Sequence, residues 1–176
     1  HFLSTTAYDC DQLYILGDFV EYWLGDDDAA KGLEPVFNKM KEVSDQGLEI
    51  LLMHGNRDFL MGEDLAQRCG CTLIPDPYII DIDDTPIILM HGDTLCTDDL
   101  RYQELRLMLR HPDWQKEFLA KPLAERTMLA EALRKQSIEE TGEKSEDIMD
   151  VNADAVEQAF KEHQVQLMIH GHTHRT

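Results

Sequence analysis

Four short stretches of the chain place glycine next to aspartate, asparagine or histidine. They read Gly17-Asp18, Gly55-Asn56-Arg57-Asp58, His91-Gly92-Asp93 and Gly171-His172-Thr173-His174. Carboxylate, amide and imidazole groups are the ligands that borderline divalent ions such as Mn, Fe, Co and Zn accept. A single glycine–aspartate pair is more often a loop or helix cap. Because the pattern recurs, we interpret the four stretches together as a metal site.

Each stretch completes a short apolar run of the kind that forms a buried strand. The runs lie within Leu13–Asp18, Leu48–His54, Pro86–His91 and Gln166–His170. Ligands bind at the carboxyl ends of the strands in open α/β sheets. We therefore expect these polar side chains, which are far apart in the sequence, to meet at one edge of a sheet.

The segments between these runs predict an α/β fold. Leu33–Ser44 has apolar residues at a helical spacing, with Gly47 as a stop signal, so that strand, helix and strand predict a parallel pair. The remaining predicted elements are a helix at 63–69, strands at 72–74, 78–82 and 86–90, the last two joined as a hairpin through Asp83-Asp84, and an amphipathic helix at 150–163.

The segment 98–149 differs from the rest of the chain. It has high helical propensity and is broken by Pro112 and Pro122, so two or three helices are expected to interrupt a sheet that resumes later. We predict an inserted helical cap at 98–149 and a core formed by 1–97 and 150–176.

The charge distribution narrows the class of ligand. The chain has 176 residues and a formal net charge of -19, which argues against a nucleic-acid partner or generic adsorption to anionic membranes. A phosphate-bearing ligand would have to be held by local cations. Most of these lie in the predicted cap, at Arg101, Arg106, Arg110, Lys116, Lys121, Arg126, Arg134 and Lys135.

The four cysteines, Cys10, Cys69, Cys71 and Cys96, form no Cys-x-x-Cys pair. We predict reduced, mostly buried thiols in a cytosolic protein. No run approaches the length of a membrane span, and no signal peptide is visible. The sequence starts at His1 without methionine and stops directly after a motif, so we expect both ends to be cut.

The ligand types predict two-metal chemistry. Asp18 can bridge two cations, while Asn56, His91 and His172 can complete one site. His172 and His174 would face opposite sides of a continuous strand, so a turn is expected to direct them toward different cations. Two metals polarise a phosphoryl group and lower the pKa of a bound water, which favours phosphoester hydrolysis.

Neighbouring polar residues have supporting interpretations. Arg57 can donate a fork of hydrogen bonds to a phosphate. His54 and His170 are expected to support the site rather than bind metal. The run Asp26–Asp28 is interpreted as a solvated turn or helix cap rather than a cation site.

Together, these motifs and their flanking residues resemble the calcineurin-like metallophosphoesterase family, from about Leu13 to Thr176. The resemblance implies sheet layers flanked by helices. The wider family usually has histidine where this chain has Arg57, whereas the subfamily acting in lipid A synthesis has arginine. The resemblance to that subfamily is therefore the narrower one.

The resemblance implies a reaction and a location. The reaction is hydrolysis of the pyrophosphate of UDP-2,3-diacylglucosamine by water attack at the α-phosphorus, giving UMP and 2,3-diacylglucosamine 1-phosphate. Two Mn²⁺ ions per complete protein are implied. The expected location is cytoplasmic, peripheral to the inner membrane of a Gram-negative bacterium, with the cap at the lipid surface.

The resemblance also implies roles for individual residues. The implied metal ligands are Asp18, which would bridge, with Asn56, His91 and His172 on one ion and His174 on the other. The implied catalytic residues are Asp18, Arg57 and His172. The implied substrate contacts are Asn56, Arg57 and His172, together with Asp99, Ser137, Thr141 and Lys144 in the cap.

The apolar residues of the cap are expected to form mainly its own core, although some of them could line channels for acyl chains. They are Leu105, Leu107, Met108, Leu109, Phe118, Leu119, Leu129 and Leu133.

One departure from the family concerns the other metal site. The family supplies an Asp-x-His pair from an earlier strand, and this sequence contains none. One metal site then keeps only Asp18 and His174, so we expect the chain as written to be inactive or nearly so. Two alternatives stay open: a general metallophosphodiesterase acting on nucleotides, and a non-catalytic binding module of the same fold. The oligomeric state is left open.

Overall fold

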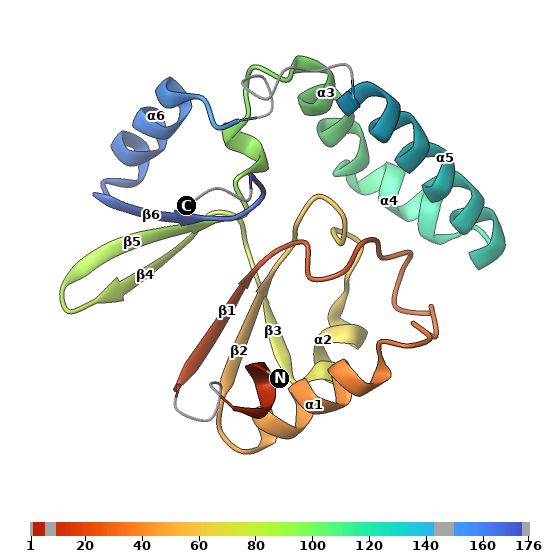
Figure 1. Cartoon of the computed structure of the whole chain (residues 1–176), viewed down its shortest axis with the longest axis horizontal. Helices are drawn as coiled ribbons and strands as arrows, with labels where there is room; N and C mark the ends of the chain where they lie inside the picture. The colour runs from red at the N-terminus through yellow and green to blue at the C-terminus, as the bar shows by residue number, and fades with distance from the viewer. Residues whose placement is uncertain (1, 6–9, 143–149, 174–176) are drawn as a thin grey trace. The chain divides into compact units, whose positions relative to one another are not determined.

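A computed structural model describes residues 2–5, 10–142 and 150–173, with side chains omitted at 4 and 136–142. The chain divides into two compact units, one up to Asp76 and one from Pro77 onward, and each unit is described by itself (Figure 1).

The first unit is a parallel sheet with two helices. Its elements are a short 3-10 turn at Phe2–Ser4, β1 (Gln12–Leu16), α1 (Glu34–Asp45), β2 (Glu49–Met53), α2 (Glu63–Cys69) and β3 (Cys71–Ile74). The strands pair in the order β1-β2-β3, and both pairings are parallel. In the central strand, residues 50–53 are all buried, which explains why this run is apolar without alternation. The predicted parallel pair is confirmed.

Helix α1 forms because its apolar residues share one face. Phe37, Met40 and Val43 follow helical spacing and are buried, and a proline lies in the first turn, where no N–H is needed. Burial of each such side chain stabilises the unit by roughly 1.5–3 kcal/mol. The Trp23 ring packs edge-on against Phe37 at 5.9 Å between centroids.

The second unit joins a mixed sheet to four helices. Its elements are β4 (Tyr78–Ile82), β5 (Thr85–Met90), a 3-10 turn at Asp93–Leu95, α3 (Leu100–Leu109), α4 (Pro112–Leu119), α5 (Leu123–Gly142), α6 (Ala153–His163) and β6 (Leu167–His170). Strands β4 and β5 are antiparallel, whereas β5 and β6 are parallel. Asp83 and Asp84 both have positive φ, of 52° and 60°, as a two-residue hairpin turn requires. The predicted hairpin is confirmed.

Helix α6 covers one face of this sheet through a small core. The core consists of Ile88, Met90, Leu95, Ala159 and Val165. The helix begins at Ala153 rather than at Asp150, because the Asn152 side chain accepts hydrogen bonds from the N–H groups of Asp154 and Ala155, at 2.9 and 3.2 Å. The predicted helix is therefore confirmed with a later start.

Helices α3, α4 and α5 occupy the segment predicted as a cap. Pro112 begins α4, as the break in the pattern predicted. Asn152 donates through Nδ2 to the Asp98 carboxylate at 3.0 Å and through its backbone N–H to the Leu95 carbonyl at 2.8 Å. Asp98 and Asn152 are thus in contact, and the separation of the cap as a domain stays a prediction.

The expectation that the apolar residues of these helices are mainly core is wrong. Of the eight side chains, only Phe118 is buried. Leu107 is 71% exposed and Met108 46%. The apolar residues of α3 are distributed around the helix instead of forming one stripe, so no single neighbour can cover them.

None of the four cysteines forms a disulfide, but only two of them are buried, fewer than predicted. Cys69 and Cys96 are buried, Cys71 is partly buried and Cys10 is exposed. Burial raises the pKa of Cys69 to about 12 and that of Cys96 to about 11, so both are protonated at neutral pH. Among the described residues, the helices include none that is both long and apolar enough to span a bilayer.

Candidate metal centre

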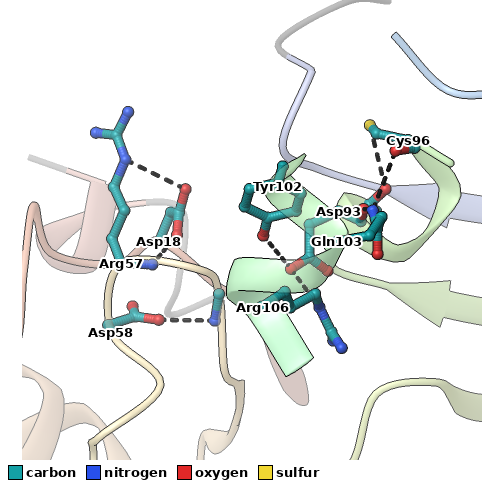
Figure 2. A network of polar contacts seen from close by, with 10 residues as sticks. Asp18, Arg57, Asp58, Asp93, Cys96, Tyr102, Gln103 and Arg106 are labelled. Carbon is teal, nitrogen blue, oxygen red and sulfur yellow. Dashed lines mark hydrogen bonds and ion pairs between the residues drawn. The ribbon is translucent and has the colours of Figure 1, made fainter. Parts of the chain in front are cut away.

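In the first unit, two predicted site loops lie side by side. Strands β1 and β2 are in register to their last residues, Leu16 opposite Met53, so the loops that follow leave the same edge of the sheet. The Arg57 backbone N–H donates to Asp18 Oδ1 at 3.0 Å, and its Nε lies 3.5 Å from Asp18 Oδ2 (Figure 2). The structure therefore brings Asp18 and the Asn56-Arg57 loop together, as predicted.

The turn after β1 is unusually tight. Gly17 and Asp18 both have left-handed φ angles, of 85° and 51°. Aspartate tolerates this conformation better than most residues. Gly55 lies directly against the turn, because a Cβ on Gly55 would be 2.1 Å from the Asp18 backbone nitrogen and 2.3 Å from its Oδ1. Only glycine can occupy that position without moving Asp18.

Gly55→Ala is therefore expected to destabilise the protein, because the added methyl group must displace backbone atoms. We expect a loss of about 1–3 kcal/mol in the free energy of unfolding, measured by urea denaturation. Gly47→Ala is the comparison for backbone strain alone, since its φ is 110° and nothing lies within 4 Å of the new Cβ. A loss below about 0.5 kcal/mol in Gly55→Ala would contradict the steric explanation.

The Asp58 carboxylate joins the same two loops. It is fully buried and accepts hydrogen bonds from the backbone N–H of Gly55 at 2.7 Å and of Phe19 at 2.6 Å. Burial raises the pKa of Asp58, although these two hydrogen bonds oppose the shift. Asp58 belongs to the motif Gly55-Asn56-Arg57-Asp58, but the sequence analysis assigned it no role. The only local signal for this role is the spacing of three residues between Gly55 and Asp58, which lets the aspartate accept the glycine N–H.

Arg57 is held at the rim of this half of the site. Its Nη1 lies 2.8 Å from Glu21 Oε2, and its carbonyl accepts the Trp23 N–H at 3.2 Å. The side chain is 43% exposed, so the guanidinium remains accessible to a phosphate. Asn56, between Gly55 and Arg57, is partly buried.

Two interpretations of neighbouring residues agree with the contacts. His54 Nε2 donates to the Met61 carbonyl at 2.7 Å, which orders the loop that carries Asn56. Asp26 accepts hydrogen bonds from the backbone N–H groups of Gly62 and Leu65, at 3.0 and 2.9 Å. Asp26 therefore caps the start of α2, and the expectation of a capping role is confirmed.

In the second unit, two predicted histidine ligands lie together. Strands β5 and β6 end in register, Met90 opposite His170, and the Gly171 N–H donates to the His91 carbonyl at 2.9 Å. The rings of His91 and His172 are 5.1 Å apart between centroids and inclined by 69°. The strand ends before His172, whose φ is 66°, so the predicted turn is present. His174 lies outside the described residues.

Gly92 allows the loops after β5 and β6 to approach each other closely, as Gly55 does for the loops after β1 and β2 in the first unit. Its φ is 110°, and a Cβ there would be 3.0 Å from both the Gly171 carbonyl oxygen and His170 Nδ1. His170 Nδ1 itself donates to the Gly171 carbonyl at 3.0 Å. His170 therefore orders the loop before His172, in line with its expected supporting role.

Asp93 ties helix α3 to the histidine loops. Its carboxylate is fully buried, and Oδ2 accepts hydrogen bonds from the Tyr102 hydroxyl at 2.5 Å and from Arg106 Nε at 2.7 Å (Figure 2). Gln103 Nε2 donates to the Asp93 carbonyl at 2.8 Å. The Tyr102 ring is 5.9 Å from that of His172 between centroids. Sequence reasoning placed Arg106 among the local cations but did not foresee this network.

The network determines the charge state of Asp93. Burial alone would raise the pKa of Asp93, but the Arg106 guanidinium and the Tyr102 hydroxyl outweigh it and hold the pKa below its usual value. Burial and the neighbouring Asp93 raise the pKa of Tyr102, so the phenol remains a donor at neutral pH. Asp93 and Arg106 therefore form a charged pair within the folded unit.

Asp93→Asn is expected to destabilise the metal-free protein in a pH-dependent manner. The folded pKa of Asp93 lies below its ordinary value of 3.8, so the stabilisation is complete above pH 3.8 and is lost as the pH falls further. We expect the variant to lose about 3 kcal/mol at pH 7 and to approach wild type in acid. Urea unfolding of the metal-free protein between about pH 2 and pH 7 measures this.

Asp45→Asn is the control for Asp93→Asn, because Asp45 pairs with Lys41 at the exposed surface. We expect it to change the free energy of unfolding by less than about 1 kcal/mol throughout. A difference between wild type and Asp93→Asn that did not vary with pH would contradict the assigned charge pair.

The predicted substrate contacts in the cap receive unequal support. Asp99 is 8% exposed, and its Oδ1 accepts the Tyr102 N–H at 3.1 Å, so it caps α3. Ser137 and Thr141 fall within α5, but their side chains lie outside the described set. Lys144 lies outside the described residues altogether. Substrate contact by these four residues stays a prediction.

The donor groups fit a divalent cation. The first unit offers the Asp18 carboxylate beside the Asn56 loop, and the second offers the imidazoles of His91 and His172 at one strand edge. Oxygen and imidazole donors without a thiol suit Mn, Fe, Co or Zn. Binding of one metal ion by donors from both units stays a prediction.

Comparison with known proteins agrees with this chemistry. The family described as Calcineurin-like phosphoesterase matches residues 4–176. A UDP-2,3-diacylglucosamine hydrolase from Marinobacter nauticus is 48% identical over 174 residues, which cover 99% of this chain and 71% of that protein. Hydrolases of the same name from Cellvibrio japonicus and Pseudomonas paraeruginosa are 48% and 47% identical, over 99% of this chain and 72% of each protein.

Proposed function

The chain belongs to the calcineurin-like phosphoesterase family, and from this premise we propose that it hydrolyses the pyrophosphate of UDP-2,3-diacylglucosamine to UMP and 2,3-diacylglucosamine 1-phosphate. The observation that carries the proposal is the pairing of predicted ligands at two strand edges, Asp18 with the Asn56-Arg57 loop and His91 with His172. The similarity to hydrolases of that name along 99% of the chain supports the substrate.

Mn²⁺ is the proposed metal. Asp18, Asn56, His91 and His172 would hold one ion, and Asp18 and His174 would contribute to the other. Bound divalent ions polarise a phosphoryl group and lower the pKa of a coordinated water. The protein residues fix where this can happen, because Asp18 and His172 are held in left-handed backbone conformations by the loops around them.

Arg57 is the proposed phosphate-binding residue. Its guanidinium projects from the loop that carries Asn56 and is held by Asp18 and Glu21. A planar guanidinium can donate two parallel hydrogen bonds to phosphate oxygens. In a chain of net charge -19, such a local cation is required to attract a diphosphate. The His172 imidazole is proposed to donate to a second phosphate oxygen.

Helices α3 to α5 are proposed to receive the acyl chains and to contact the membrane. The exposed apolar side chains on these helices are Leu100, Leu107, Met108, Leu119, Met128 and Leu129. They are interspersed with the basic residues identified in the sequence. Apolar and cationic groups together suit an amphipathic anion. We propose a peripheral protein on the cytoplasmic side of the inner membrane of a Gram-negative bacterium.

An assay of UMP release with Mn²⁺ tests the reaction. We expect slow release from UDP-2,3-diacylglucosamine relative to the Marinobacter nauticus hydrolase, because this sequence contains no Asp-x-His. His91→Ala should reduce the rate by at least about 100-fold through loss of a ligand. Equal turnover by the two proteins would refute the expectation that the absence of this pair lowers the rate.

UDP-N-acetylglucosamine, which lacks the long acyl chains, separates the alternatives. Equal rates on the acylated and the short-chain substrate would favour a general metallophosphodiesterase. Mn²⁺ binding without release of UMP from either substrate would favour a non-catalytic binding module.

Cosedimentation with vesicles of phosphatidylethanolamine and phosphatidylglycerol tests the membrane proposal. Leu107→Glu and Met128→Glu remove apolar side chains that are each 71% exposed on α3 and α5. We expect each change to weaken vesicle binding by about tenfold. Ile82→Glu on β4 is the matched control, because Ile82 is 52% exposed outside the cap. Equal loss in the control would contradict binding through the cap.

A further inference from the structure

We propose that Asp58 is a positioning residue of the metal centre, whose carboxylate sets the spacing between the loop of Asp18 and the loop of Asn56. The inference rests on the proposed function only in taking Asp18 and Asn56 as metal ligands. Asp58 itself would not touch the metal or the substrate. Its role is to hold two ligand-bearing loops at one separation.

Asp58 accepts hydrogen bonds from the residues that adjoin the two predicted ligands in the sequence. Oδ2 accepts the N–H of Phe19, which directly follows Asp18, at 2.6 Å. Oδ1 accepts the N–H of Gly55, which directly precedes Asn56, at 2.7 Å. One rigid carboxylate therefore joins the backbone on one side of Asp18 to the backbone on one side of Asn56.

The conformation of Asp18 needs such support. Asp18 has a φ of 51°, and left-handed backbone costs roughly 1–2 kcal/mol for a residue other than glycine. The hydrogen bond from Phe19 to Asp58 fixes the peptide that follows Asp18. Gly55 packs against Asp18 on the other side, where a Cβ would lie 2.1 Å from the Asp18 nitrogen. A shift of either loop would move Asp18 relative to Asn56.

The chemistry requires a carboxylate at this position. Each oxygen accepts one backbone N–H, and hydrogen bonds to an ionised acceptor are stronger than neutral ones. An asparagine has only one acceptor oxygen, so its NH₂ group would face the other N–H at short range. Asp58→Asn preserves size and shape but opposes donor to donor. It should therefore loosen one loop from the other.

Asp26 provides a matched control within the same unit. It also accepts two backbone N–H groups, those of Gly62 and Leu65, through two different oxygens, and its Oδ1 accepts the Trp23 indole N–H as well, at 2.9 Å. These donors lie at the start of α2, away from Asp18 and Asn56. Asp26→Asn therefore imposes the same donor conflict on the fold without acting on the ligand spacing.

The test measures Mn²⁺ affinity separately from stability. Free Mn²⁺ is quantified by electron paramagnetic resonance during titration of the metal-free 176-residue protein, and urea unfolding with EDTA gives the stability. We expect Asp58→Asn to raise the Kd for Mn²⁺ by about 10–100-fold. Asp26→Asn should lose comparable stability while its Kd stays within about twofold of wild type.

Asp18→Asn separates this inference from the proposed function. If Asp18→Asn leaves the Kd for Mn²⁺ unchanged, the ligand assignment fails. If Asp18→Asn weakens binding but Asp58→Asn does not, the positioning role of Asp58 fails. An equal increase of the Kd in Asp26→Asn would also overturn it, since general loosening of the unit would then explain the effect.

Asp58→Ser provides a second variant in case Asp58→Asn lacks a cooperative unfolding transition. Its hydroxyl oxygen accepts one N–H and leaves room for a water at the other. We expect an increase in the Kd for Mn²⁺ between those of wild type and Asp58→Asn. A folded Asp58→Ser protein with the wild-type Kd would refute the role of the carboxylate.

Discussion

A charged carboxylate enclosed by protein must find hydrogen-bond donors, and two such carboxylates in this chain lie in the loops that carry predicted ligands. Asp58 takes backbone N–H groups from the loops after β1 and β2. Asp93 takes the Tyr102 hydroxyl and the Arg106 guanidinium from α3. The need to satisfy each buried charge therefore fixes loop positions that apolar packing alone would leave adjustable.

The two units arrange their predicted ligands on a common plan. In each, two parallel strands end in register, a glycine allows the following loops to touch, and a buried aspartate anchors one of those loops. The glycines are Gly55 and Gly92, and the anchors are Asp58 and Asp93. The units differ in the elements that the buried aspartate connects. Asp58 joins the loops of two strands, whereas Asp93 joins a strand end to a helix of the predicted cap.

Much of this framework could be predicted from the sequence, because strand ends and turns are signalled locally. Apolar runs predicted the strands β1, β2, β5 and β6, and Asp83-Asp84 predicted the hairpin between β4 and β5. Pairing of parallel strands then placed Asp18 beside the Asn56 loop and His91 beside His172. The anchoring roles of Asp58 and Asp93 could not be found in this way, since a donor such as Phe19 is 39 residues from Asp58. The exposure of Leu107 was missed because helical propensity does not indicate what covers a helix.

The hydrogen bond between Asn152 and Asp98 has a consequence for how such a protein can diversify. Because the segment it encloses leaves and re-enters the fold at one point, a change in its length adds little to the entropy of closing the loop. Changes of length beyond α3 would leave in place the paired strands and the contacts of Asp93 with Tyr102 and Arg106. The part of the segment beyond α3 can accordingly vary in length while the predicted ligands stay at the ends of their strands.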